Sequence, residues 1–245
     1  MNILSWSISA KIRGLIKFSF FIFVGINSTS YSQEITLKSL LNEMISFDAA
    51  ARWPQPEYTL KQTSSYDRKS VSPDKPGWFA NNDCSQFYGV ELHGKSKEYI
   101  MFDAAGPGVI VRFWLTTNVK PGTMRLYFDN EPTASIQIQA YDLMKAGFDL
   151  GPGLLNPHSS YTPDGIGGNT LYLPMPYQKH CKITWEDCDT LHTQQSKYYQ
   201  VNYRSYPPGT KIKTFRKEDI VLNKALIDKV EYSLWNPETC SNGKP

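Results

Sequence analysis

The run "YIMFDAAGPGVIVRFWLTT", residues 99–117, decides the fold class. It holds two stretches rich in β-branched and aromatic residues, separated by a Gly-Pro-Gly turn. Similar runs follow, most of them bounded by Gly, Pro, Asn or Asp: "TMRLYFD" (123–129), "ASIQIQAY" (134–141), "NTLYLPMPY" (169–177), "CKITWE" (181–186) and "SKYYQVNYRSY" (196–206). Several strands at short spacing predict a mainly β fold, an antiparallel β-sandwich or jelly roll.

Strict alternation along residues 108–117 predicts two faces: Val109, Val111, Phe113 and Leu115 on one, and Ile110, Arg112, Trp114 and Thr116 on the other. Arg112 and Trp114 then share a face. A planar cation beside a large aromatic suits a sugar, because hydroxyls need donors and the apolar ring face packs on an indole. The alternative is an Arg112–carboxylate pair within the sandwich and a Trp114 that belongs to the core.

Two helices are predicted outside the strands. Thr36 can cap a helix whose apolar residues follow the 3.6-residue period at Leu37, Leu40, Leu41, Met44, Ile45 and Phe47. A second helix is expected over residues 217–234, with Val221, Ala225, Leu226 and Val230 on or near one stripe.

The first 32 residues resemble a secretory signal peptide. Lys11, Arg13 and Lys17 precede the apolar run "FSFFIFVGI" (18–26), and Ser30 and Ser32 are small residues suited to a cleavage site. The run is too short to span a bilayer comfortably. We therefore expect an exported protein, periplasmic or extracellular, with no membrane span after cleavage.

Removing this leader changes the charge balance. The leader holds three basic and no acidic residues, which leaves 23 basic against 23 acidic residues of the 26 and 23 in the whole chain. A formally neutral mature chain has no electrostatic attraction to nucleic acid, so none is expected as a partner. A neutral, aromatic-rich protein suits an uncharged ligand.

The four cysteines, Cys84, Cys181, Cys188 and Cys240, would lie in a compartment that permits disulfides, but three complete pairings are possible and sequence cannot choose. "HCKITWEDCDTLH" (180–192) mixes Cys and His without the close ligand pairs of zinc sites. Neither a metal nor another cofactor is expected.

Two polar segments are candidates for ligand contact. "SSYDR" (64–68) and "GWFANND" (77–83) combine acids, a base, amides and aromatics with no aliphatic run. Our hypothesis is that Asp67, Arg68, Asn82 and Asp83 contact ring hydroxyls while Trp78 packs on the sugar face; the alternative is a solvated loop. His158 and Tyr161, in the Gly- and Pro-rich segment 143–168, are weaker candidates.

The pair Asp129 and Glu131 could suggest glycosidase carboxylates, but "FDNEP" is turn chemistry, and the turn is favoured. No nucleophile elbow, Walker loop, dinucleotide fingerprint or His-Glu-x-x-His helix is present, so common hydrolase, nucleotide and metalloprotease classes lack their marks.

Six stretches in order resemble the amino-terminal part of glycoside hydrolase family 172: "SSYDR", "GWFANNDCSQF", "GPGVIVRFWLTT", "MRLYFDNE", "LYLPMPYQKHCKI" and "YYQVNYRSYPPGTKIKTF". The resemblance runs from about residue 37 to 215. It implies a double jelly-roll subunit of trimers or hexamers, and a retaining hydrolase of furanosides such as α-D-fructofuranosides or D-arabinofuranosides. Its two catalytic glutamates are implied for the second jelly roll, so none is assigned here.

The expected organisation is a signal peptide (1–32), a helix and extended segment (33–60), a first jelly roll (61–215) and a helix with a linker toward an absent second domain (216–245). The substrate-binding candidates are Asp67, Arg68, Trp78, Asn82, Asp83, Arg112 and Trp114. Three interpretations stay open: a homo-oligomeric furanosidase that lacks its catalytic half in this chain, a non-catalytic carbohydrate-binding or assembly module, and a nonfunctional remnant.

Overall fold

The computed structural model describes residues 34–76, 78–94, 96–117, 121–157, 167–187 and 196–237. The signal peptide, His158, Tyr161, Cys188, His192 and Cys240 lie outside these residues, so the expectations for them stay predictions. Within the described residues no helix is long and apolar enough to cross a membrane.

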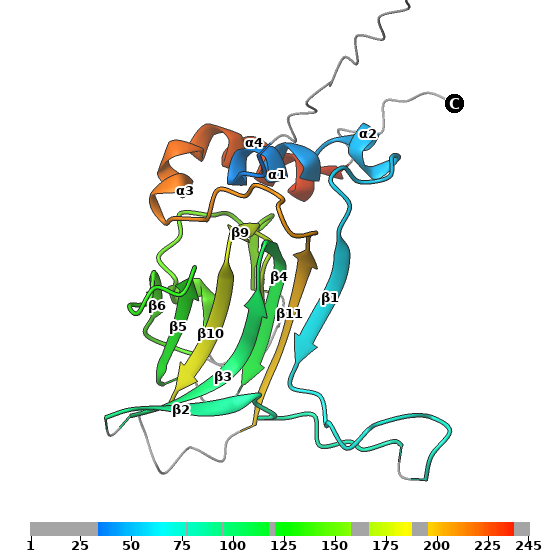
Figure 1. Ribbon diagram of the computed structural model, residues 1–245. Helices are drawn as coiled ribbons and strands as arrows, with labels where there is room; N and C mark the ends of the chain where they lie inside the picture. The colour runs from blue at the N-terminus through cyan, green and yellow to red at the C-terminus, as the bar shows by residue number, and fades with distance from the viewer. Residues whose placement is uncertain are drawn as a thin grey trace, which may run out of the picture. The chain divides into compact units, whose positions relative to one another are not determined.

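The described strands form two antiparallel sheets packed face to face, which confirms the predicted mainly β sandwich (Figure 1). The first sheet has the order β1-β11-β4-β8-β7, and β9 also pairs with β4. Its strands are β1 (Thr59–Ser64), β4 (Gly108–Thr117), β7 (Leu155–Asn156), β8 (Gly167–Leu171), β9 (Met175–Tyr177) and β11 (Lys197–Ser205). The second sheet has the order β2-β3-β10-β5-β6, with β2 (Gly89–His93), β3 (Ser96–Ala105), β5 (Thr123–Phe128), β6 (Ile136–Ile138) and β10 (His180–Glu186).

The core lies between the sheets. Alternate residues of the central strands fill it: Phe113 and Leu115 from β4, Tyr199 and Val201 from β11, and Ile183 from β10, with Trp185 among the largest buried side chains. Because successive side chains of a strand point to opposite faces, the residues between them face outward. The outer faces of the two sheets are therefore where function can be placed.

The alternation along β4 is broken by a bulge. Asn202 of β11 pairs with Arg112, whereas Tyr203 pairs with Ile110, so Val111 is the extra residue. The prediction that Val109 and Val111 share a face with Phe113 and Leu115 is wrong. Ile110 belongs to the main core with Phe113 and Leu115, and Val109 packs in a separate cluster beside Ile35, Leu40, Tyr206 and Ile212.

The helices gather at one end of the sandwich (Figure 1). The helix α1 (Leu37–Met44) begins with a capping box, in which Thr36 Oγ1 accepts from Ser39 N at 3.1 Å and Ser39 Oγ accepts from Thr36 N at 2.9 Å. The short α2 (Phe47–Ala50) follows, and a 3₁₀ turn, η1, covers Leu143–Lys145.

The predicted carboxy-terminal helix is two helices. It divides at Asn223 into α3 (Glu218–Leu222) and α4 (Lys224–Trp235). Ile220, Ile227 and Val230 are buried, whereas Val221, expected on the apolar stripe, is 77% exposed.

Candidate functional site

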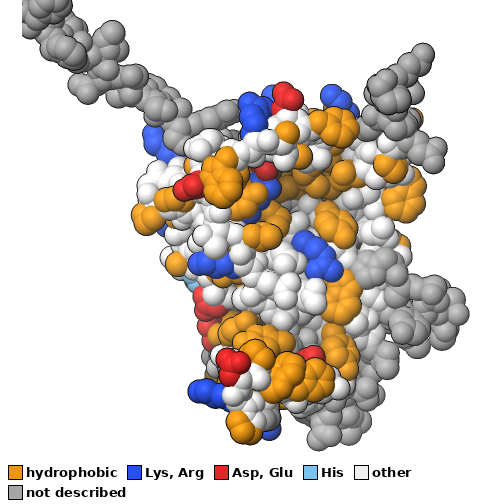
Figure 2. All heavy atoms as spheres, turned by 90° about the vertical axis from the view of Figure 1, so that its right-hand side faces the viewer, with side chains coloured by type: hydrophobic (Ala, Val, Ile, Leu, Met, Phe, Trp, Pro, Cys, Tyr) orange, Lys and Arg blue, Asp and Glu red, His pale blue; other side chains and the backbone are white. Residues whose placement is uncertain are grey.

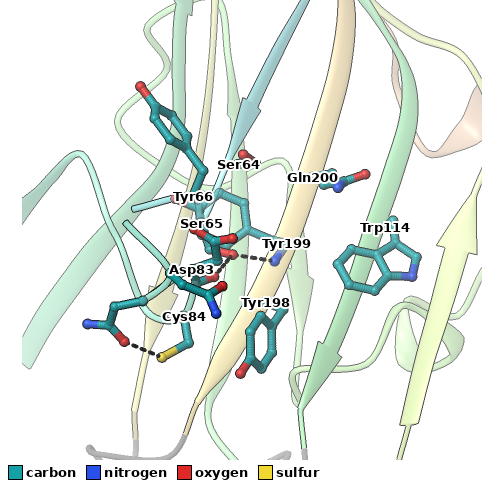
Figure 3. Close-up of a pocket in the computed structure, with 11 residues that line it drawn as sticks. Ser64, Ser65, Tyr66, Asp83, Cys84, Trp114, Tyr198, Tyr199 and Gln200 are labelled. Atoms are coloured by element: carbon teal, nitrogen blue, oxygen red, sulfur yellow. Dashed lines mark hydrogen bonds between the residues drawn. The ribbon is translucent and has the colours of Figure 1, made fainter. Parts of the chain in front are cut away.

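An open pocket lies where the segment after β1 crosses the first sheet. Its volume is ≈ 490 Å³. Its walls come from that segment and from β4 and β11 (Figure 3). The lining residues are Ser64, Ser65, Tyr66, Asn81, Asn82, Asp83, Cys84, Trp114, Tyr198, Tyr199 and Gln200. Aromatic rings, amides and hydroxyls thus dominate, which is the composition of a site for a neutral polar ligand.

Strand pairing positions the sheet side of this pocket. Trp114 of β4 lies directly opposite Gln200 of β11, and Tyr198 lies two residues further along the same face. Figure 3 shows Trp114 and Tyr198 projecting from these two strands. Tyr198 is 37% exposed and Tyr66 is 46% exposed, so both rings are open to a ligand. The sheet therefore supplies an aromatic platform with an amide beside it.

The loop side of the pocket is fastened to β11 through Ser65. Its hydroxyl donates to the Asp83 carbonyl at 2.7 Å and accepts from Tyr199 N at 3.2 Å, while Ser65 N donates to the Tyr199 carbonyl at 3.1 Å. One buried serine thus joins both ends of the loop to the strand. The pocket wall is preorganised, which lowers the entropic cost of binding.

Asp67 and Asp83 lock the two ends of the loop together. Asp67 N donates to Asp83 Oδ1 at 2.6 Å, and Asp67 Oδ2 accepts from Asn82 N at 3.1 Å. Asp67 Oδ1 also accepts from Lys69 N at 3.0 Å, and Asp67 is buried. The structure thus places Asp67 beneath the pocket as a support, whereas Asn82 and Asp83 line the pocket itself.

Arg68 lies between two tyrosine rings. Its guanidinium is 4.1 Å from the Tyr88 ring centroid and 5.1 Å from that of Tyr66, and it donates from Nη2 to the Ser64 carbonyl at 3.1 Å. Stacked cation–aromatic contacts of this kind stabilise the ring position. Arg68 therefore holds Tyr66, which lines the pocket, and is not itself among the lining residues.

Trp78 lies on the exposed part of the loop. It is 46% exposed and meets Phe79, itself 70% exposed, in an edge-to-face contact with ring centroids 5.5 Å apart. Trp78 is not among the residues that line the pocket. Among the described residues, Trp114 is the indole that the structure brings to it.

Arg112 lies on the same outer face as Trp114, as predicted, and its partners are amides. Its Nη1 donates to Gln200 Oε1 at 2.9 Å and to Asn202 Oδ1 at 3.1 Å. Asn202 Nδ2 in turn donates to Gln62 Oε1 of β1 at 2.9 Å. These four side chains form an amide ladder (Gln62, Arg112, Gln200 and Asn202) across three strands, next to the pocket.

The electrostatics of the pocket suit a neutral ligand. Burial raises the pKa of the Tyr199 phenol well above its usual value, although the nearby Arg68 opposes this shift. Tyr199 therefore stays protonated and donates to the Gln86 carbonyl at 2.7 Å. Of the residues that line the pocket, only Asp83 carries a carboxylate.

Retaining glycosidases need two carboxyl groups about 5–5.5 Å apart. A single lining carboxylate that already accepts a backbone hydrogen bond does not provide this pair. The described pocket can hold and orient a sugar, but it does not contain the set of groups that cleaves one. Asp129 does not supply the second carboxylate: it lies in the predicted turn, with φ of 54°, and accepts from Lys179 N at 2.6 Å.

Sequence reasoning missed Tyr66, Tyr198 and Gln200. The signal for the last two was present in "YYQVNYRS", because Tyr199 and Val201 are core residues and their neighbours must face outward. Tyr66 had no such signal, because its position depends on the loop contacts with Asp83 and β11. Cys84 also lines the pocket; it and the buried Cys181 are free thiols. Within the described residues no group of three or more potential metal ligands is found.

The described fold is a β-sandwich with an aromatic and amide-lined pocket on one sheet. The comparison with family models makes this specific: the first β-sandwich domain of glycoside hydrolase family 172 matches residues 56–222. The chain belongs to glycoside hydrolase family 172, which confirms the resemblance seen in its motifs. A search of curated proteins found no match.

Proposed function

We propose that this chain provides sugar recognition in an exported, homo-oligomeric furanoside hydrolase of the α-D-fructofuranosidase or D-arabinofuranosidase type. Family membership implies a carbohydrate substrate. The observation that carries the proposal is the pocket of ≈ 490 Å³, which Tyr66, Trp114 and Tyr198 line together with Gln200 and Asp83. A furanose ring would pack on the Trp114 indole, with its hydroxyls bonded to the amide and carboxylate groups.

The catalytic glutamates, in this proposal, come from the family's second jelly roll and not from the residues described here. The single carboxylate of the pocket supports this division. A pocket with a single carboxylate also favours the second candidate, a non-catalytic carbohydrate-binding module. The two candidates share the pocket and differ only in whether a catalytic domain acts on the sugar it holds.

The test is binding and turnover measured on the same protein. The chain is titrated with methyl α-D-arabinofuranoside and methyl α-D-fructofuranoside by calorimetry, and the corresponding aryl glycosides are used to follow release of the aryl alcohol. We expect saturable binding without turnover, and weaker binding in W114A. If neither furanoside binds saturably, the proposal is refuted.

Joining the chain to a second jelly-roll domain of the family separates the two candidates. If the chain is part of a furanosidase, the joined protein releases the aryl alcohol, and W114A lowers the rate of release. If the chain is a binding module, the joined protein binds the sugar without releasing the aryl alcohol.

Arg68→Ala in the joined protein should impair substrate use more than folding, because Arg68 holds Tyr66. Equal loss of substrate use and folding would show a purely structural role.

A further inference from the structure

A second hollow lies at the other end of the β1–β11 pair. Its volume is ≈ 420 Å³, and it is lined by Trp53, Glu57, Tyr58, Thr59, Ser205, Tyr206 and Pro207. We refer to it as the Trp53 pocket and to the first as the Trp114 pocket. Like the first, it combines exposed aromatic surface with a carboxylate and hydroxyls, so it has the groups that a sugar needs.

Trp53 is largely exposed, and the edge of its ring is hydrogen-bonded. Its indole Nε1 donates to Glu57 Oε1 at 2.7 Å, and 73% of the residue is open to solvent. The hydrogen bond restrains the edge of the ring and leaves its faces free. An exposed indole hydrogen-bonded at its edge presents a face on which the apolar side of a sugar can pack.

Tyr58 is held next to it by two contacts. Its ring meets Tyr206 edge to face, with centroids 5.6 Å apart, and the Arg204 guanidinium lies 4.3 Å from its centroid. Arg204 is itself paired with Glu43 at 2.7 Å. The charge of Arg204 is thus already compensated, and the wall of the Trp53 pocket presents aromatic surface and hydroxyls.

The strand register gives the distance between the two pockets. Thr59 pairs with Ser205 in the Trp53 pocket, and Ser64 pairs with Gln200 in the Trp114 pocket. Five residues separate these pairs, about 17 Å along the strands at roughly 3.4 Å per residue. Between them lie Gln62 and Asn202 of the amide ladder, which are bonded to each other.

Besides Arg112, the charged residues between the two strand pairs are Lys61 of β1 and Arg204 of β11, and Arg204 is paired with Glu43. Figure 2, which shows the side on which β1 lies, has hydrophobic side chains in its upper and lower parts, and in the middle a mostly white surface with Lys and Arg side chains among it. A protein partner would favour an apolar centre with a polar rim, which is the reverse arrangement. Two aromatic pockets with the amide ladder between them fit an oligosaccharide, which is a chain of rings that carry hydroxyl groups.

We propose that the Trp53 pocket is a second sugar subsite, which binds distal units of the same uncharged oligosaccharide whose other end lies in the Trp114 pocket. This rests on the proposed function of the Trp114 pocket. Binding at both ends makes the second contact intramolecular, so affinity should rise with oligosaccharide length beyond the span of the amide ladder.

The experiment compares a disaccharide and an octasaccharide of D-arabinofuranose, titrated calorimetrically into the full chain and into W53A, W114A and W235A. Trp235 of α4 is a matched control because it is exposed to 56% and lines neither pocket. We expect W53A to weaken octasaccharide binding about tenfold and to leave disaccharide binding within about twofold. W114A should weaken both, and W235A neither.

The outcomes separate the two proposals. If W114A weakens both ligands while W53A binds the octasaccharide as the parent chain does, the second subsite is wrong and the proposed function stands. If W114A changes neither, the proposed function fails. If W53A alters the sedimentation coefficient and not octasaccharide binding, the Trp53 pocket is a contact between copies of the chain. The variant E57Q, which keeps the volume of the side chain, should also weaken the octasaccharide, and an unchanged affinity there counts against the subsite.

Discussion

The outer faces of the two sheets use polar residues in opposite ways. On the second sheet, Glu98 is buried and accepts from Tyr127 Oη at 2.9 Å and Thr184 Oγ1 at 2.5 Å. Arg125 contacts Glu98 at 3.2 Å and Glu186 at 2.6 Å. These charges satisfy one another, and the low exposure of Glu98 leaves little for a ligand to reach.

On the first sheet the corresponding face is a ladder of amides around Arg112, with aromatic pockets at both ends. Neither Gln200 nor Asn202 carries charge, and Arg112 has amide partners in place of a carboxylate. Residue type alone therefore does not identify a site. Arginine on the second sheet closes a network, whereas arginine on the first sheet orients groups that face an open pocket.

The largest effect is expected from R125M. The substitution keeps much of the side-chain length but leaves Glu98, which is 4% exposed, without its nearest cationic partner; the other basic side chain, His93, is 4.0 Å away. Breaking a buried pair in this way costs about 3 kcal/mol of unfolding free energy. Urea denaturation measures this loss, and furanoside affinity of the folded fraction should be unchanged.

The double variant E98Q/R125M is the control for this mechanism. Removing both charges should recover part of the lost stability, because the buried Glu98 carboxylate is gone, although Glu186 still loses its contact with Arg125. If R125M is as stable as the parent chain, or if it loses sugar binding at unchanged stability, the second sheet is not the self-contained structural face described above.

The next largest effect is that of W114A on binding. Loss of the stacking surface in the Trp114 pocket should weaken furanoside binding by about ten- to thirtyfold, which corresponds to roughly 1.5–2 kcal/mol. Calorimetric titration measures this, with W235A as the matched tryptophan control. A parallel W78A variant tests the sequence hypothesis: because Trp78 is not among the residues lining the pocket, we expect its affinity to equal that of the parent chain.

The central strands could be predicted because their core residues carry a strong pattern. Residues 108–117 and 181–186 alternate or run apolar, and both became strands within one residue of the expected bounds. The strands β1 and β2 could not be predicted in this way. Both are edge strands with mostly exposed residues, so their positions are set by pairing with β11 and β3 rather than by a pattern of burial.

The candidate site was partly predictable for the same reason. Trp114 and Arg112 share a face by alternation, and this held because both lie beyond the bulge at Val111. The roles of Asp67 and Asp83 were not predictable, because their hydrogen bond joins residues sixteen positions apart across an irregular loop. Only the folded loop distinguishes a carboxylate that supports the pocket from one that lines it.

A smaller effect is expected from R112M, the counterpart of R125M on the first sheet. It removes the donor that fixes Gln200 and Asn202. Because both amides lose their fixed orientation, sugar binding should weaken by about three- to tenfold, which corresponds to roughly 1 kcal/mol. The unfolding free energy should change by less than about 1 kcal/mol, because the amides can bond to water instead. A loss of stability equal to that of R125M would show that the two faces do not differ.

The smallest effect is a pH dependence confined to the charged face. Hydrogen bonding from Ser96, with the Arg125 guanidinium, lowers the pKa of Glu186 in the folded chain below its usual value. An unfolded glutamate has a pKa of about 4.3, so it takes up its proton at a higher pH than folded Glu186 does. The contribution of Glu186 to stability is therefore complete above the unfolded pKa and is lost as the pH falls through the lower folded pKa.

Urea denaturation between about pH 6 and 3 should show a shallower loss of unfolding free energy for E186Q than for the parent chain. The variant Q200A on the neutral face removes no titrating group, so its pH dependence should match the parent; equal slopes for E186Q and the parent would mean that Glu186 is not coupled to folding.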